Sequence, residues 1–91
     1  MNLSVVIPAY NEANNIKATV EELLKVIGRI SDIGDVKVVV VDDHSSDNTY
    51  DMVRNMKDPR VMCLRLSRRS GSHAALRAGF IESSGDFVMC L

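Results

Sequence analysis

Two adjacent carboxylates, Asp42 and Asp43, directly follow an unbroken run of four valines, Val38–Val41. Such a run is typical of a strand that is buried on both faces, so the two acids lie at its C-terminal end. A carboxylate in that position can accept hydrogen bonds from ribose hydroxyls or from the N–H groups of a base. Asp is also a common turn former and helix cap, which would be a purely structural role. We expect one carboxylate to cap the turn and the other to face a crevice.

Two other loops carry polar or charged groups at the ends of apolar segments. Pro8 ends the first apolar segment, because its ring removes a ladder donor, and opens a turn that runs to Glu12. Arg68 and Arg69 stand in the loop after the third apolar segment. Guanidinium groups pair well with a diphosphate, but two arginines in a loop are equally consistent with a solvated basic surface.

Predicted strands and helices alternate along the chain. Apolar residues recur at helical spacing between the apolar runs, which favours parallel βαβ units. Right-handed crossovers then favour a doubly wound α/β sheet with the strand order 3-2-1-4, whose crevice opens at the C-terminal end of the first strand. All three polar loops reach that edge. The predicted strands are 3–7, 36–41, 61–66 and 87–91, and the predicted helices are 16–30, 49–57 and 73–83.

The composition argues against nucleic acid as a partner. The 91 residues carry a net charge of −1, which gives no general affinity for polyanions. The chain has no Trp and only two Tyr and two Phe, so a platform for stacking single-stranded bases is not expected either.

The two cysteines and the lengths of the apolar segments indicate the cellular compartment that we expect for the protein. Cys63 and Cys90 lie inside apolar runs without metal-ligand spacing, which favours free thiols in a reducing compartment. The first residues lack the basic and apolar regions of a signal peptide, and no apolar run reaches the ~20 residues of a membrane span. We expect a cytoplasmic location.

Three segments together resemble the N-terminal half of family 2 glycosyltransferases. They are Val6-Ile-Pro-Ala-Tyr-Asn-Glu12, Val41-Asp-Asp-His-Ser-Ser-Asp-Asn-Thr49 and the stretch 67–79, which reads Ser-Arg-Arg-x-Gly-x-x-Ala-Ala-Leu-x-Ala-Gly. The resemblance covers nearly the whole chain. It is closest to the branch that transfers a sugar from a nucleotide sugar to a polyprenyl phosphate, as dolichol-phosphate mannose synthases do.

The resemblance implies a GT-A nucleotide-binding domain and assigns roles within it. Asp43 matches the acid that binds the uracil or guanine edge or the ribose, and Asp42 is its structural neighbour. Tyr10 would lie near the base, or alternatively pack on the first helix. Arg68 or Arg69 would pair with the diphosphate. The residues implied to line the pocket after the first strand are Pro8, Ala9, Tyr10 and Glu12.

The chain departs from the family pattern at three positions. His44 stands where the family usually has Gly, so that turn must either avoid a strongly positive φ or accept strain. We expect His44 to be an exposed turn residue. Arg69 and Ser72 stand where the polyprenyl-phosphate branch commonly has Asn and Lys, which bears on the branch more than on the family.

The resemblance also implies parts that these residues do not contain. The family's metal site, an Asp-x-Asp triplet for Mg²⁺ or Mn²⁺, follows the strand that begins at Gly85-Asp86-Phe87, and the sequence ends at Leu91. We therefore expect 1–91 to be the N-terminal nucleotide-binding portion of a longer enzyme. This portion would contain no catalytic residue and would be inactive alone. The enzyme would use a UDP- or GDP-sugar and a polyprenyl phosphate or other acceptor at the cytoplasmic face of a membrane.

Three alternatives remain. A dinucleotide-dependent oxidoreductase would need Gly-x-Gly-x-x-Gly after the first strand, and the segment 8–13 has no glycine. A phosphoacceptor signalling domain would want its reactive Asp after the third strand, where Ser67 and Arg68 stand. A non-catalytic assembly role is the third, since a sheet that ends after its fourth strand leaves an edge for pairing with another copy.

Overall fold

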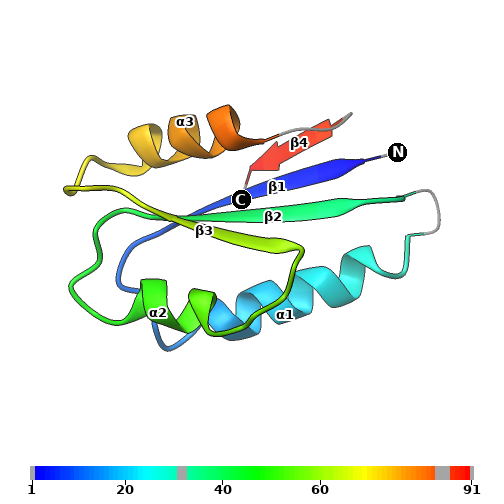
Figure 1. Cartoon of the computed structure of the whole chain (residues 1–91), viewed down its shortest axis with the longest axis horizontal. Coiled ribbons are helices and arrows are strands. Elements are labelled where there is room, and N and C mark those ends of the chain that lie inside the picture. The colour runs from blue at the N-terminus through cyan, green and yellow to red at the C-terminus, as the bar shows by residue number, and fades with distance from the viewer. Residues whose placement is uncertain (1, 31–32, 84–86, 91) are drawn as a thin grey trace.

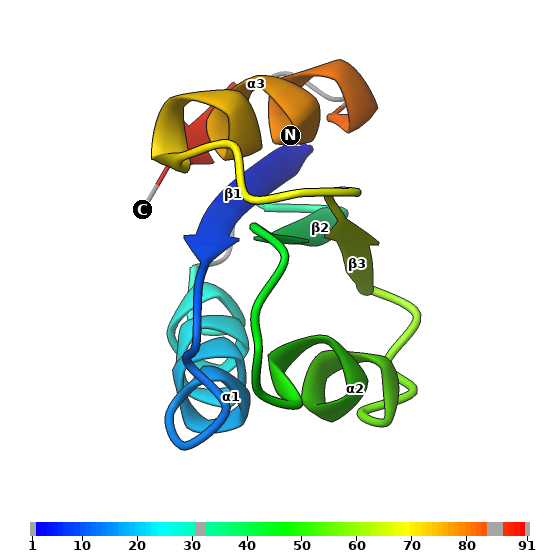
Figure 2. The same ribbon diagram turned by 90° about the vertical axis from the view of Figure 1, so that its left-hand side faces the viewer.

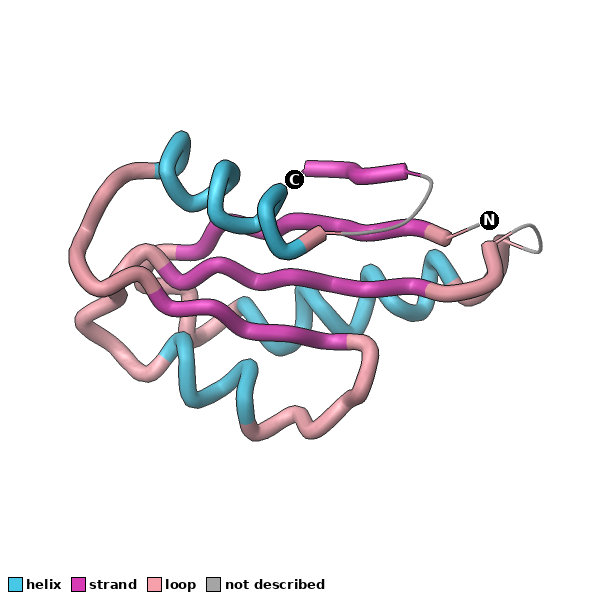
Figure 3. The backbone as a smooth tube through the Cα atoms, turned by 45° about the horizontal axis from the view of Figure 1, so that its top comes forward, coloured by secondary structure: helices cyan, strands magenta, loops and turns pink. Residues whose placement is uncertain are grey.

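The computed structural model of the chain describes residues 2–30, 33–83 and 87–90. A parallel four-stranded sheet runs through the middle in the order β3-β2-β1-β4, which confirms the predicted α/β class and strand order (Figure 3). The strands are β1 (Leu3–Ala9), β2 (Val36–Asp42), β3 (Val61–Arg65) and β4 (Phe87–Cys90), and the helices are α1 (Ile16–Ile27), α2 (Thr49–Arg54) and α3 (Ser72–Glu82).

The helices cover both faces of the sheet. Figures 1 and 2 show α1 and α2 together on one face and α3 on the other. The chain moves outward from β1 through β2 to β3, then crosses back to pair β4 with β1. Because crossovers are right-handed, this reversal of direction places α3 opposite the other two helices. A reversal of this kind is where doubly wound sheets bind their ligands.

The valine run is buried on both faces, as its unbroken apolar character predicts. Val38 and Val40 face α1 and α2, in one core cluster with Val20 of α1 and Val53 of α2. Val39 and Val41 belong to the cluster under α3. Burial of each such side chain stabilises the fold by about 1.5–3 kcal/mol. The two clusters therefore fix the sheet between its helices.

Two helices end earlier than their apolar periodicity predicts. The helix α1 ends at Ile27 rather than at Ile30, which is 47 % exposed and has no core to enter. The helix α2 ends at Arg54, after which the N–H of Lys57 bonds to the carbonyl of Arg54 and φ of Lys57 becomes +52°. Pro59 disfavours a helical conformation in the residue before it, so the chain leaves the helix ahead of β3.

No helix in the described ranges is long and apolar enough to cross a membrane.

Gly79 allows α3 to lie close to the sheet. A Cβ on this residue would stand 2.2 Å from Cγ1 of Val6 and 3.2 Å from Cγ2 of Val41. Ala75, one turn earlier, is fully buried against the same strands. The small inner face of α3 therefore brings this helix, and the loop that precedes it, close to β1 and β2.

We predict that Gly79→Ala destabilises the fold despite the better helix propensity of Ala. Overpacking a filled core costs ~1–3 kcal/mol, whereas Ala gains about 1 kcal/mol over Gly in a helix. A Cβ only 2.2 Å from Val6 places the cost in the upper part of that range, so we expect the free energy of unfolding in urea to fall by about 1–2 kcal/mol. His73→Ala, at an exposed position of the same helix, is the control and should change it by less than ~0.5 kcal/mol. An unchanged midpoint for Gly79→Ala would show that α3 does not lie so close.

Candidate functional site

The C-terminal ends of β1, β2 and β3 meet at one edge of the sheet. Ala9 pairs with Asp42, and Asp42 pairs with Arg65. The ladder continues one step further, since the N–H of Asp43 donates to the carbonyl of Ala9 at 2.8 Å and that of Leu66 donates to Asp42 at 2.9 Å. The three loops that the sequence singled out therefore start side by side.

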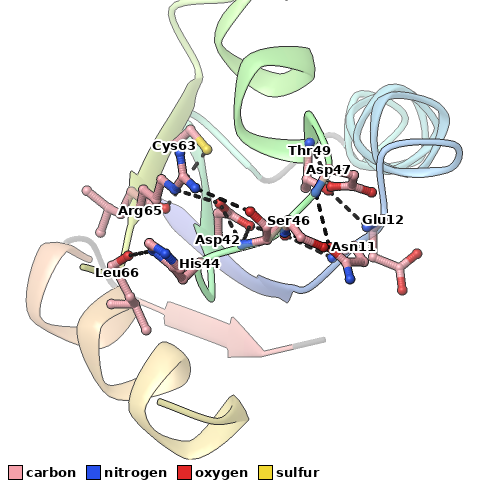
Figure 4. Close-up of polar contacts among 12 residues, drawn as sticks. Asn11, Glu12, Asp42, His44, Ser46, Asp47, Thr49, Cys63, Arg65 and Leu66 are labelled. Atoms are coloured by element: carbon pink, nitrogen blue, oxygen red, sulfur yellow. Dashed lines mark hydrogen bonds and ion pairs between the residues drawn. The ribbon is translucent and has the colours of Figure 1, made fainter. Parts of the chain in front are cut away.

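The side chain of Asp42 makes its hydrogen bonds to the turn that follows it. Its side chain is fully buried and accepts hydrogen bonds from the backbone N–H of Ser45, at 3.2 Å, and from the hydroxyl of the same residue (Figure 4). The guanidinium of Arg65 lies 3.5 Å from its second oxygen. Asp42 therefore closes the turn and is the carboxylate with the structural role.

Asp43 holds the third loop. It is 2 % exposed, and its two oxygens accept from the backbone N–H groups of Ser70 at 2.8 Å and Gly71 at 2.9 Å. The Nε of Arg69 lies 3.4 Å from Oδ2. The sequence suggested a carboxylate open to a crevice, but this one is covered by the loop from β3. Hydrogen bonds to a charged carboxylate are stronger than neutral ones, so this contact fixes the loop on the edge of the sheet.

Tyr10 meets the same loop. The guanidinium carbon of Arg69 lies 3.5 Å from the centroid of the Tyr10 ring, which is 38 % exposed. A cation over an aromatic face at this distance is attracted by the ring's negative face. The structure thus brings Tyr10, Asp43 and Arg69 together, from three different loops.

The remaining predicted residues do not contribute side chains to this group. Pro8 and Ala9 lie within β1, paired with Val41 and Asp42, so the prediction that Pro8 ends this strand was wrong. On its other side β1 pairs with β4 only as far as Val6 within the described residues, and a strand tolerates Pro along such an edge. Glu12 is exposed and contributes its backbone N–H, which donates to the hydroxyl of Thr49 at 2.9 Å. Arg68 is exposed, and its carbonyl accepts from the hydroxyl of Ser70 at 3.0 Å.

Sequence reasoning missed Asn11, which binds the first loop to the second. Its Oδ1 accepts from the N–H and hydroxyl of Ser46, at 2.9 and 3.2 Å, and from the N–H of Asp47 at 3.3 Å (Figure 4). Its own N–H donates to the hydroxyl of Ser45 at 2.8 Å. Asn11 has a φ of +53°, a conformation that Asn tolerates better than most residues. In the sequence, the one sign of this role was that an Asn follows Tyr10 in the predicted turn.

Asp47 adds a second bond between these two loops. Its carboxylate accepts from the N–H of Ala13 at 3.2 Å and from the N–H and hydroxyl of Thr49. The hydrogen bond from the Thr49 hydroxyl, followed by those from the backbone, holds the pKa of Asp47 below its ordinary value. Asp47 is thus ionised at neutral pH and holds the loop ahead of α2.

His44 adopts a positive φ, which was one of the two possibilities that the sequence left open for this turn. Its φ is +58°, the left-handed conformation for which Gly is usually used. The ring is exposed, as expected, and Nδ1 lies 3.1 Å from the carbonyl of Leu66. As a donor to that carbonyl, the ring bridges the second and third loops and offsets part of the backbone strain.

The described residues hold no metal-binding cluster, and the Cys63 thiol is not activated. No group of three His, Cys, Asp or Glu side chains lies close enough to bind an ion within 2–30, 33–83 and 87–90. Burial raises the pKa of the Cys63 thiol to about 12, so it stays protonated and unreactive. The carboxylates of Asp42, Asp43 and Asp47 at the sheet edge instead accept hydrogen bonds from backbone N–H groups.

A cavity of about 530 Å³ lies away from these loops, between α1 and the segment after α2. Its lining mixes both charges, and Asp58 and Arg60 neutralise each other at 2.6 Å. Its lining contains no aromatic side chain on which a base could stack, so the sheet edge with Tyr10 remains the better candidate site.

The fold and the strand-end loops define a doubly wound α/β domain of the kind that binds nucleotides at this edge. The sequence profile described as "Glycosyl transferase family 2" matches residues 4–91, and the chain belongs to this family. The resemblance carried by the three loop segments is confirmed.

Curated relatives are similar along nearly the whole chain. An undecaprenyl-phosphate 4-deoxy-4-formamido-L-arabinose transferase of Proteus mirabilis (strain HI4320) is 36 % identical over 92 residues. A protein of the same description from Yersinia pestis (strain Pestoides F) is 32 % identical. Each alignment covers 98 % of this chain and 28 % of the relative, so the chain spans little more than a quarter of their length.

Solved glycosyltransferase structures share the fold. The mannosyltransferase PcManGT from Pyrobaculum calidifontis, in complex with GDP-Man and Mn²⁺, superposes with a TM-score of 0.79 at 27 % identity, over 94 % of this chain and 25 % of its own. TarS 1–349 of S. aureus gives 0.82 at 26 % identity, over 100 % and 27 %. The sheet and helices described above thus form an N-terminal part of a GT-A fold.

We predict that Asn11→Ala loosens the first two loops. The variant loses the Oδ1 acceptor and places Ala in a left-handed conformation, which together cost about 1–3 kcal/mol. The free energy of unfolding should fall by that amount, and amide exchange at Ser46 and Asp47 should accelerate. Asn11→Gly separates the causes, because Gly relieves the backbone strain but also lacks the acceptor. If the amides of Ser46 and Asp47 exchanged at the same rate in wild type, Asn11→Ala and Asn11→Gly, the hydrogen bonds to Oδ1 would not be what joins the two loops.

Proposed function

We propose that this chain is the N-terminal, donor nucleotide-binding part of a glycosyltransferase that takes its sugar from a UDP- or GDP-sugar. The observation that carries the proposal is the meeting of Tyr10, Asp43 and Arg69 at the C-terminal strand edge, where doubly wound sheets bind ligands. An aromatic ring, a carboxylate and a cation are the groups that a base, a ribose and a diphosphate require. Membership of the family and the GDP-Man complex of a structural neighbour support it.

The acceptor we propose is a polyprenyl phosphate. The relatives from Proteus and Yersinia are described as undecaprenyl-phosphate transferases, and they are similar over the whole described sheet. Such an acceptor is membrane-bound, so we place the activity of the longer protein at the cytoplasmic face of a membrane. Residues 1–91 would supply the donor nucleotide-binding part and would not turn over alone.

Each nearby residue has a role in this proposal. Asp43 accepts from a base N–H or a ribose hydroxyl, Tyr10 stacks on the base, and Arg68 and Arg69 supply positive charge to the diphosphate. Mg²⁺ or Mn²⁺ would neutralise the leaving diphosphate in the complete enzyme, and a neighbour's structure contains Mn²⁺. Its ligands would come from outside the described residues. The backbone of Pro8 and Ala9 forms the floor of the site.

We predict that Asp43→Asn weakens binding of the preferred nucleoside diphosphate about ten- to a hundred-fold. A charge-assisted hydrogen bond contributes about 1.5–3 kcal/mol, and Asn cannot accept from both the loop and the ligand. Stability should also fall, because the new amide would face the N–H of Ser70 or Gly71. Titration well below the unfolding midpoint separates the two effects. Asp51→Asn, which removes an exposed charge on α2, is the control. Unaltered affinity with lowered stability would leave Asp43 with its structural role alone.

We predict weak binding that metal does not strengthen. UDP or GDP should bind the 91-residue chain in the high micromolar to millimolar range, about 4–6 kcal/mol. Calorimetry with and without Mn²⁺ should give the same affinity, because the described carboxylates form no metal cluster. A protein of the relatives' full length should instead gain affinity with Mn²⁺. Metal-enhanced binding by the short chain would mean that its own acids, such as Asp42 and Asp43, bind the ion.

A further inference from the structure

Arg69 covers both groups that would recognise a nucleoside. Its guanidinium lies 3.5 Å above the Tyr10 ring, where a base would stack, and its Nε lies 3.4 Å from Asp43. Asp43 is only 2 % exposed and Tyr10 is 38 % exposed. The nucleoside end of the site is therefore filled by a side chain of the protein itself.

The three contacts to Asp43 differ in strength. The backbone N–H groups of Ser70 and Gly71 donate at 2.8 and 2.9 Å and are fixed by the loop, whereas the contact to Arg69 is longer and comes from a side chain that is 53 % exposed. Of the three, Arg69 is the partner that a ligand can displace without unfolding the loop. Its flexible stem also lets the guanidinium swing outward while the backbone stays in place.

We propose that Arg69 sets the ligand preference of the site by excluding nucleosides that carry no phosphate. This inference rests on the proposed function. A neutral nucleoside must displace the guanidinium from Tyr10 and Asp43 and offers it no new partner. A nucleoside diphosphate displaces it too, but its phosphates then bind the released cation, and bidentate guanidinium–phosphate hydrogen bonds are stronger than the single 3.4 Å contact to Asp43. The new bonds to the phosphates thus offset the free energy that is lost when the guanidinium leaves Tyr10 and Asp43.

The test compares nucleoside with nucleoside diphosphate in wild type and Arg69→Gln. NMR shift titrations with uridine and UDP, and with guanosine and GDP, give the two dissociation constants for the preferred base. We expect the nucleoside to bind about three- to tenfold more tightly to the variant, since the cover is gone. The diphosphate should bind no more tightly, so the ratio of the nucleoside's dissociation constant to that of the diphosphate should fall by at least about three- to tenfold.

Arg29→Gln is the matched control. It removes the same charge from an exposed position after α1, at the far end of the sheet from the site. Its ratio should equal that of wild type. An unaltered ratio in Arg69→Gln would overturn the inference, and a nucleoside that binds more weakly to that variant would show that Arg69 supports the base instead of covering its place.

A readout without ligand separates this inference from the proposed function. The guanidinium carbon of Arg69 lies over the Tyr10 ring in the free chain, so its ¹³C resonance should be shifted upfield and should lose that shift in Tyr10→Leu. Adding the diphosphate to wild type should move it to an ordinary position. A resonance at its ordinary position in the free chain would show that Arg69 does not lie over Tyr10. That result would overturn the inference even if nucleotides bind. Failure of wild type to bind any of the four ligands would instead overturn the proposed function, and the inference with it.

Discussion

Two buried carboxylates at the end of β2 hold the functional edge of this domain together. Asp42 closes the turn toward α2, and Asp43 fixes the loop from β3 through two backbone N–H groups. Buried carboxylates are costly unless every oxygen finds donors, and both residues meet that requirement within the chain. The arrangement requires the valine strand to end where it does, because a shift by one residue would exchange the two acids between the faces of the sheet.

The loops are coupled in pairs across the strand ends. Asn11 and Asp47 join the first loop to the second, and Asp43 and His44 join the second to the third. Short polar side chains make most of these bonds to backbone groups, which fixes the loops without a further strand or helix. A ligand at this edge therefore meets a largely preformed surface, in which the exposed side chain of Arg69 is the group that is free to rearrange.

The fold could be predicted because its signals are local and repeat along the chain. The unbroken valines, the alternation with helical periodicity and the handedness of crossovers left a short list of topologies, and the commonest of them is the strand order found. The predicted C-terminal ends of α1 and α2 were less accurate, since they depend on the contacts of Ile30 and Lys57 in the folded chain. The contact of Arg69 with Tyr10 could not be predicted, because it joins residues 59 positions apart through rotamers that no local pattern encodes. The same is true of the bonds that Asn11 makes.

The valine-rich sheet has a consequence for how the core is built. The fully buried apolar side chains of its two central strands are short and β-branched, and no aromatic ring is among the buried residues of 2–30 and 33–83. Such side chains have essentially one torsion to fix, so little rotational freedom is lost when they are packed. The interior can therefore be well ordered although each side chain buries little area. Shape rather than bulk specifies the centre of this sheet, and a longer side chain there would overpack it.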